Sequence, residues 1–192
     1  MSRFNYAYEG TPPWDIGRPQ SEIVRLTEAG EINGGVLDVG CGTGENSLFL
    51  ASKGHEVWGI DAAPLAIEKA KEKASQRDLK ATFLVHDALD LASLGREFDT
   101  VIDSGLFHTF SDEEREMFVR SLASVLRHGG TYCMLCFSDK EPPGGGPRRI
   151  SQAEIRSTFI RGWKINYIRE TSFESDLGGY APRAWLASIT RD

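Results

Sequence analysis

Three observations predict that the chain folds as one α/β domain with a doubly wound parallel sheet. A hydrophobic segment, 36–39, runs directly into a turn with three closely spaced glycines, which predicts a strand, a tight turn and the start of a helix. From residue 45 to residue 137, segments of strand and helix character alternate, as βαβ units require. The chain ends in two strand-like segments, 163–168 and 184–190, with only a loop between them. We therefore expect these last strands to form an antiparallel hairpin at the sheet edge.

Length and composition limit the class of protein. The 192 residues suffice for a single domain with one sizeable core. A net charge of −6 argues against a nucleic-acid partner, which requires clustered Lys and Arg. No run of about 18 apolar residues is present, and the first ten residues lack the pattern of a secretory signal. We therefore expect a cytoplasmic monomer or homodimer that acts on a small molecule and binds neither nucleic acid nor membrane.

The N-terminal region differs in composition from the rest of the chain. Its first 20 residues are rich in aromatic residues, glycine and proline, which is typical of an irregular arm. A short helix is expected from about Ser21 to Ala29. We divide the chain into residues 1–30, an arm and helix on the substrate side, and residues 31–192, the ligand-binding domain.

The next elements follow the alternation closely. Residues 45–53 have helical spacing of apolar residues and end at Gly54, a left-handed cap. Residues 56–61 form a second strand, and Pro64 opens a helix that continues to about Ala74. Two further strands are expected at 82–85 and 99–103.

The two helices that follow begin with the same pattern. A serine stands three residues before a glutamate at Ser111 and again at Ser151, which is the spacing of a capping box. We expect the first helix to run to about Arg127, where 128–130 stop it, and the second to about Phe159. A fifth strand is expected at 131–137.

The three cysteines do not indicate a disulfide framework or a metal site. Cys133 and Cys136 form a C-x-x-C motif, but they lie in an expected strand, where residues three apart point to opposite faces. We interpret them as core residues. No His, Cys and Asp cluster has metal-ligand spacing, so no metal is expected.

The spacing of the glycine turn selects among ligands. Gly40, Gly42 and Gly44 form G-x-G-x-G, and Glu45 follows at once. The dinucleotide fingerprint is G-x-G-x-x-G, with a pyrophosphate on the helix N-terminus, where an acidic residue is unfavourable. The turn therefore argues against a dinucleotide whose pyrophosphate lies at this helix.

This turn resembles the first motif of class I S-adenosylmethionine (SAM)-dependent methyltransferases, in which Gly40, Gly42 and Gly44 would cradle the methionine end of the cofactor. The resemblance implies SAM as cofactor and a Rossmann-like, seven-stranded sheet of order 3-2-1-4-5-7-6 in residues 31–192. It covers about residues 30–140 for the generic fold. One departure is His128, which stands where the family usually has proline.

The resemblance also assigns cofactor-binding residues at strand ends. Asp61 closes the second strand, and its two oxygens are suited to both ribose hydroxyls. The alternative is an aspartate that caps the helix beginning at Pro64. Asp87, with the Ala88 backbone beside it, resembles the residue that accepts the adenine amino group, and the alternative is a turn aspartate. Ala62 completes this side of the predicted site.

The remaining predicted cofactor residues lie nearer the methionine end. Asp38 lies within the first strand, where a buried carboxylate needs a partner. By resemblance it supports the glycine turn or the cofactor's ammonium group, and a purely structural hydrogen-bonded role is the alternative. Asp103 and Ser104 follow the fourth strand, where the family lines the methionine end and the substrate mouth.

Segments outside the generic fold indicate the methyl acceptor. Residues 103–106 do not match the D/N-P-P-Y/F motif of nucleic-acid amino methyltransferases. The segment 11–20 resembles the N-terminal part of small methyltransferases that act on thiols, halides and thiopurines, and of bacterial enzymes that methylate heterocyclic or quinone-like toxins. The resemblance continues through 104–108 and 135–139. It implies a small, fairly apolar acceptor and a detoxifying role.

Three residues are candidates for a direct part in the reaction. Trp14 is placed to pack over the cofactor and meet its sulfonium with a π-face, and the alternative is that it only anchors the arm. His108, with Asp103, is the candidate catalytic residue, acting as a base toward a phenol or N-hydroxy heterocycle. The alternative for His108 is a structural, hydrogen-bonded histidine.

The sequence therefore predicts a metal-independent, SAM-dependent methyltransferase that acts on sulfur, oxygen or nitrogen of a small molecule. The competing hypothesis is a non-catalytic SAM-binding module that senses the cofactor or holds a partner.

Overall fold

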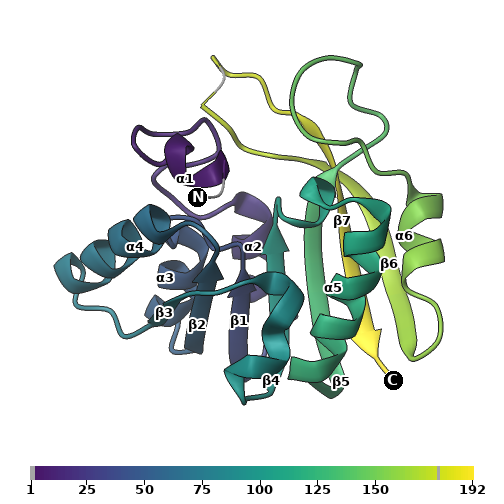
Figure 1. The fold of residues 1–192 in the computed structure, drawn as a ribbon, viewed down its shortest axis with the longest axis horizontal. Coiled ribbons are helices and arrows are strands. Elements are labelled where there is room, and N and C mark those ends of the chain that lie inside the picture. The colour runs from purple at the N-terminus through teal and green to yellow at the C-terminus, as the bar shows by residue number, and fades with distance from the viewer. Residues whose placement is uncertain (1–2, 177) are drawn as a thin grey trace.

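The computed structural model, which describes residues 3–176 and 178–192, contains one seven-stranded sheet of order β3-β2-β1-β4-β5-β7-β6 (Figure 1). This is the order that the family resemblance implied. The strands are β1 Gly35–Val39, β2 Glu56–Asp61, β3 Thr82–Val85, β4 Phe98–Ser104, β5 Leu126–Phe137, β6 Trp163–Ser172 and β7 Arg183–Arg191. The helices are α1 Arg3–Ala7, α2 Ser21–Glu28, α3 Glu45–Ser52, α4 Pro64–Gln76, α5 Asp112–Val125 and α6 Gln152–Thr158, with 3₁₀ turns η1 Ala88–Leu94 and η2 Phe107–Thr109.

Strand direction places the functional edge of the sheet. Strands β3, β2, β1, β4 and β5 pair in parallel, whereas β7 pairs antiparallel with both β5 and β6. Because β1 has β2 on one side and β4 on the other, the chain changes direction across the sheet at β1. Ligands of such sheets lie beyond the carboxyl ends of the strands at this switch point. The glycine turn follows β1 there.

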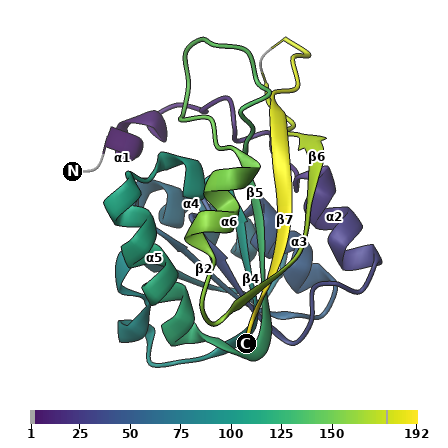
Figure 2. The same ribbon diagram turned by 90° about the vertical axis from the view of Figure 1, so that its right-hand side faces the viewer.

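The sheet separates two hydrophobic cores. Figure 2 shows α5 and α6 on one side of it and α2 and α3 on the other. Cys136 belongs to the first core, with Phe118 of α5, and Cys133 to the second, with Ile23 of α2. The predicted opposite orientation of the two cysteines is therefore confirmed, and both are free thiols. Ile23 also shows that the 1–30 segment contributes to the same core as the rest of the chain.

The start of β5 differs from the sequence prediction. Helix α5 ends at Val125 instead of Arg127, and β5 begins at Leu126 instead of residue 131. Leu126 is fully buried, adopts an extended conformation and pairs with Phe98, ahead of an irregularity in the ladder. Burial of this leucine against β4 therefore ends the helix before the 128–130 segment is reached.

The N-terminal arm lies across the carboxyl edge of the sheet and is attached on two sides. On one side, the Lys69 ammonium of α4 donates to the carbonyls of Tyr8 and Gly10 at 2.7 and 2.9 Å. On the other, the backbone N–H of Asp176, in the β6–β7 connection, donates to the carbonyl of Pro13 at 2.8 Å. The arm also contains a short helix, α1, which the sequence did not predict.

No helix within residues 3–176 and 178–192 has both the length and the apolar character needed to cross a membrane.

Candidate active site

Three positions of the turn between β1 and α3 have backbone conformations that favour glycine. Gly40, Gly42 and Gly44 have φ angles of +70°, +54° and +84°, in the left-handed region that side chains disfavour. A Cβ on Gly42 would lie 2.9 Å from the Tyr8 hydroxyl, and one on Gly44 would lie 2.9 Å from Phe83 Cζ. The turn therefore has no room for side chains at these positions, and its last glycine leads directly into α3.

The Asp61 carboxylate connects the glycine turn to the next strand end. Its Oδ2 accepts the N–H of Gly42 at 3.0 Å, and its Oδ1 accepts the N–H of Ala63 at 2.8 Å. Burial raises the pKa of Asp61, although these two hydrogen bonds oppose the shift. Each oxygen keeps a lone pair for a further donor, as ribose binding would require. The carboxylate makes no side-chain cap to α4, whose N-cap is Ala63.

Asp38 is a second strand-end carboxylate, and it is nearly inaccessible to solvent. Its Oδ2 accepts the Ser47 hydroxyl of α3 at 2.6 Å. Burial, followed by the charges of Asp103 and Asp61, raises its pKa to about 7. The hydrogen bond braces the start of α3, so the predicted support of the glycine turn and a structural role coincide in this contact.

The Asp103 carboxylate points into the fold. It accepts the backbone N–H groups of Leu106 and Phe107 at 2.7 and 3.0 Å and the Tyr132 hydroxyl at 2.8 Å. Burial raises its pKa to about 6. The side chain therefore fixes the turn after β4, which presents the half-buried Ser104 at the edge of the sheet.

The predicted adenine side is assembled at the same edge. Asp87 is exposed, and its Oδ1 accepts the N–H of Leu89 at 2.9 Å as the N-cap of η1. The turn role foreseen as the alternative is thus present, while its second oxygen makes no hydrogen bond within the described residues. Ala88 is buried beside it, and Ala62 is exposed at the end of β2.

Tyr8 of the arm lies directly over the glycine turn, a position that the sequence did not reveal. It is buried, whereas Trp14 is 49% exposed. The Trp14 indole N–H donates to the Tyr8 hydroxyl at 3.1 Å, and the two rings meet edge to face. The one sequence signal for Tyr8 is its place in the same aromatic segment, six residues before Trp14. The structure therefore places Trp14 outside Tyr8 relative to the turn.

His108 lies in an aromatic cluster next to the end of β4. Its ring centroid is 4.9 Å from that of Phe137 and 5.9 Å from that of Phe173, and these two phenylalanines pack against each other. The backbone N–H of Phe137 donates to His108 Nδ1 at 3.0 Å. Burial, with smaller contributions from the charges of Arg115 and Arg149, lowers the pKa of His108 to about 3. Neither phenylalanine was identified from the sequence.

A glycine- and proline-rich loop, 139–149, borders this cluster and is held by its own arginines. The Arg149 guanidinium donates to the carbonyls of Pro142, Gly145 and Pro147 and lies over the Phe137 ring. Arg148 pairs with Asp112 and Glu154 at the starts of α5 and α6. Both arginines therefore shape the loop.

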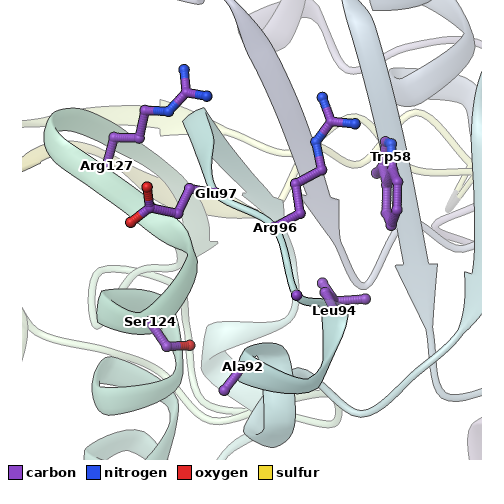
Figure 3. Close-up of a pocket in the computed structure, with 8 residues that line it drawn as sticks. Trp58, Ala92, Leu94, Arg96, Glu97, Ser124 and Arg127 are labelled. Atoms are coloured by element: carbon purple, nitrogen blue, oxygen red, sulfur yellow. The ribbon is translucent and has the colours of Figure 1, made fainter.

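An open hollow at the opposite edge of the sheet contains none of the predicted site residues. Figure 3 shows it between the start of β4 and the end of α5, with Trp58 and Arg96 on one side and Arg127 on the other. Both arginines are paired, Arg96 with Glu56 and Arg127 with Asp99, each at 2.6 Å. Neither arginine of the hollow is therefore free to pair with an anionic ligand.

Comparison with known proteins establishes the family of the chain. Residues 36–130 match a methyltransferase domain family. A 2-heptyl-1-hydroxyquinolin-4(1H)-one methyltransferase of Mycobacteroides abscessus is 38% identical over 172 residues, which are 88% of this chain and 76% of that protein. The chain belongs to the class I SAM-dependent methyltransferases. A probable thiol methyltransferase of Arabidopsis thaliana is 31% identical to this methyltransferase over 79% of the chain and 68% of the relative.

Solved structures extend the similarity over nearly the whole methyltransferase. One, from work on the conversion of a disulfide bond into a thioacetal group during echinomycin biosynthesis, has a TM-score of 0.91, is 37% identical and covers 98% of this chain and 92% of its own. Magnesium protoporphyrin IX methyltransferase from Synechocystis PCC 6803 with bound SAM has a TM-score of 0.70, is 26% identical and covers 90% of this chain and 77% of its own. SAM is therefore the cofactor of this protein.

The charges at the carboxyl edge suit this cofactor. Asp38, Asp61 and Asp103 lie together, and no Lys or Arg among the described residues is a source of their pKa shifts. Buried carboxylates without a cation are costly. The sulfonium and ammonium groups of SAM are positive, so the residues fit a ligand of this charge.

Proposed function

We propose that this methyltransferase transfers the methyl group of SAM to sulfur, oxygen or nitrogen of a small, fairly apolar molecule. Its relatives support this acceptor class by their names, which specify a hydroxyquinolinone, thiols and, in Brassica oleracea, thiocyanate. The observation that carries the proposal is the apolar cluster of His108, Phe137 and Phe173 beside the cofactor edge. A detoxifying role follows as part of this proposal.

The proposed cofactor contacts follow the geometry of the strand ends. The Gly40–Gly44 turn holds the methionine part, and Asp61 accepts the ribose hydroxyls with the lone pairs that Gly42 and Ala63 leave free. The free oxygen of Asp87 accepts the adenine amino group, with Ala62, Ala88 and Ser104 lining the base and the sulfur. Asp38 holds the turn in place through Ser47.

When bound, SAM supplies an electrophilic methyl group on a good leaving group. The protein then has to hold the methyl acceptor in line and exclude water. The arm covers the glycine turn, and loop 139–149 borders the aromatic cluster, so both are placed to exclude water. Positioning of this kind contributes on the order of 7–11 kcal/mol to the lowering of a barrier. A strong base is therefore not required, and Asp103, with its oxygens turned into the fold, acts as a positioning residue.

The proposal is tested by pairing cofactor binding with turnover. Calorimetry with SAM and its demethylated product, S-adenosylhomocysteine (SAH), measures binding, and SAH release measures transfer to a panel of thiols, phenols and hydroxyquinolones. Transfer to members of this panel is expected. Tight SAM binding with no SAH release from any of them would contradict the proposal and favour a cofactor sensor, for which no observation currently speaks.

A further inference from the structure

The protonation state of His108 is fixed by the backbone. A peptide N–H can only donate, so the 3.0 Å contact from Phe137 N to Nδ1 makes Nδ1 an acceptor without a hydrogen. The neutral ring then carries its hydrogen on Nε2. Burial in the aromatic cluster favours this neutral form. His108 is therefore a hydrogen-bond donor at Nε2 and has no free lone pair with which to remove a proton.

This N–H faces the end of β4, where the methyl acceptor must approach. A Cβ on Gly105 would lie 3.6 Å from Cε1 and 3.8 Å from Nε2 of His108, and 3.8 Å from Phe173 Cε1. Gly105 has a φ of +98°, so this position is kept open by a residue that carries no side chain. Nε2 has no hydrogen-bond partner among the described residues. It keeps some contact with solvent, although the ring as a whole is buried. The donor therefore opens into space at the cofactor edge.

The charges around this donor favour a negative ligand. Arg115 of α5 and Arg149 of loop 139–149 are the charged groups that act on the ring. Arg115 is almost fully buried: its Nη1 lies 3.5 Å from Asp112 and 3.4 Å from Glu154, and its Nε and Nη2 have no partner among the described residues. The nearest carboxylate of β4, Asp103, is turned toward Tyr132 and the η2 backbone. At the His108 ring the two guanidinium groups therefore favour a negative ligand, whereas the carboxylates on the cofactor side favour a positive one.

We propose that the methyl acceptor is an aromatic hydroxy or thiol compound that binds as its anion, with the negative oxygen or sulfur accepting the Nε2–H of His108 beside Phe137 and Phe173. This inference rests on the proposed function and replaces the role of His108 as a base. A lone pair of the anion forms the new bond to the methyl carbon, and the electron pair of the breaking carbon–sulfur bond stays on the sulfur of the cofactor. The anion and the sulfonium both become neutral, and no proton moves.

Ionisation of a bound chromophore tests this inference without turnover. With SAH present, 4-nitrophenol and the more acidic 2-chloro-4-nitrophenol are titrated with protein, and the phenolate absorbance is followed against pH. We expect the ionisation constant of each bound phenol to rise roughly 10- to 100-fold. Binding in the neutral form would overturn the inference while leaving the proposed function standing. If neither phenol binds and the matching nitrothiophenol does not bind either, both the inference and the proposed function are overturned.

Two substitutions separate the donor from the backbone contact. His108→Gln keeps an N–H near the position of Nε2, whereas His108→Asn keeps an acceptor for Phe137 N–H and loses the distant donor. We expect Gln to retain most of the shift in ionisation and Asn to abolish it. His55→Asn, before β2 at the other edge, is the matched control and leaves the shift unchanged.

The pH dependence of transfer distinguishes a donor from a base. With an anionic acceptor, the midpoint of the rise in kcat/KM follows the acidity of each phenol. A common midpoint for phenols of different acidity, lost in His108→Gln, would show that His108 is a base. Equal SAH affinity and thermal stability of the variants confirm that each is folded.

Discussion

The two edges of the central sheet carry charge in opposite ways. At the amino edge, Arg96 and Arg127 form exposed ion pairs around an open hollow. At the carboxyl edge, Asp38 and Asp103 are buried and Asp61 is partly buried, and none of the three forms an ion pair within the described residues. An exposed pair contributes little to stability, whereas an unpaired buried charge is costly and persists where a ligand compensates it. In this protein, the uncompensated charge coincides with the candidate site, and the hollow does not.

The largest expected effect comes from Asp38, whose pKa of about 7 lies well above that of an unfolded chain. The folded state therefore binds more protons between pH 4 and 7, so the free energy of unfolding falls as pH rises through this range. Asp38→Asn should remove this loss and stabilise the protein at pH 8, by up to about 4 kcal/mol. Urea denaturation at pH 5 and pH 8 measures the difference.

The matched substitution at the other edge is Asp99→Asn, and its expected sign is opposite. A hydrogen bond from Gly35 N–H and the pairing with Arg127 lower the pKa of Asp99, so its stabilisation is present above pH 4 and is lost in acid. Asp99→Asn should therefore destabilise the protein at pH 8. Destabilisation by both substitutions would remove the contrast between the edges.

The next effect concerns cofactor affinity. Asp61→Ala removes the proposed acceptor of the ribose hydroxyls and the link between Gly42 and Ala63. We expect the dissociation constants of SAM and SAH to rise roughly 5- to 150-fold, which corresponds to about 1–3 kcal/mol. Calorimetry measures both ligands, and an unchanged affinity would show that the ribose lies elsewhere.

A smaller effect is expected from the arm. Trp14→Ala removes a half-exposed ring whose indole N–H donates to the Tyr8 hydroxyl, and we expect SAM to bind about 0.5–1.5 kcal/mol more weakly because Tyr8 loses this hydrogen bond. Tyr8→Phe keeps the ring over Gly42 and removes only the acceptor of the indole N–H. Calorimetry on both variants tests the contact. If SAM affinity stays the same and only thermal stability falls, Trp14 is solely an anchor for the arm.

The smallest effect is expected at the hollow. Arg127→Ala breaks an exposed pair with Asp99, which contributes about 0–1 kcal/mol to stability. SAM affinity and methyl-transfer rate should be unchanged. A clear loss of SAM affinity or of methyl-transfer rate would show that the amino edge has a functional role and would contradict the contrast between the two edges.

Most of the fold was predictable because its signals are local. The bounds of β2 and β3 agree with the prediction, and the capping boxes at Ser111 and Ser151 are both formed. The predicted end of α5 was wrong because the helix ends where Leu126 is buried against Phe98, a residue distant in sequence. Helix α1 was missed because it has only five residues and no marked start.

The candidate site was predictable in place but less so in chemistry. Strand-end positions predicted that Asp61 and Asp87 lie at one edge, because the carboxyl ends of parallel strands share it, and the structure places both there. Their contacts with the cofactor stay a prediction. The state of His108 was not predictable, because it depends on a peptide N–H 29 residues away. The position of Tyr8 likewise depends on how Lys69 anchors the arm across the turn.

The double attachment of the arm has a consequence for the order of events in a catalytic cycle. The Lys73 ammonium donates to the Thr43 hydroxyl in the glycine turn and pairs with Asp15 in the arm. This lysine therefore links the position of the arm to that of the glycine turn, where we propose that the cofactor binds. The aromatic side, by contrast, is bordered by a separate loop. We therefore expect SAM to bind before the methyl acceptor and SAH to dissociate last, after the methylated product has left past loop 139–149. Inhibition by SAH would then compete with SAM and not with the molecule being methylated.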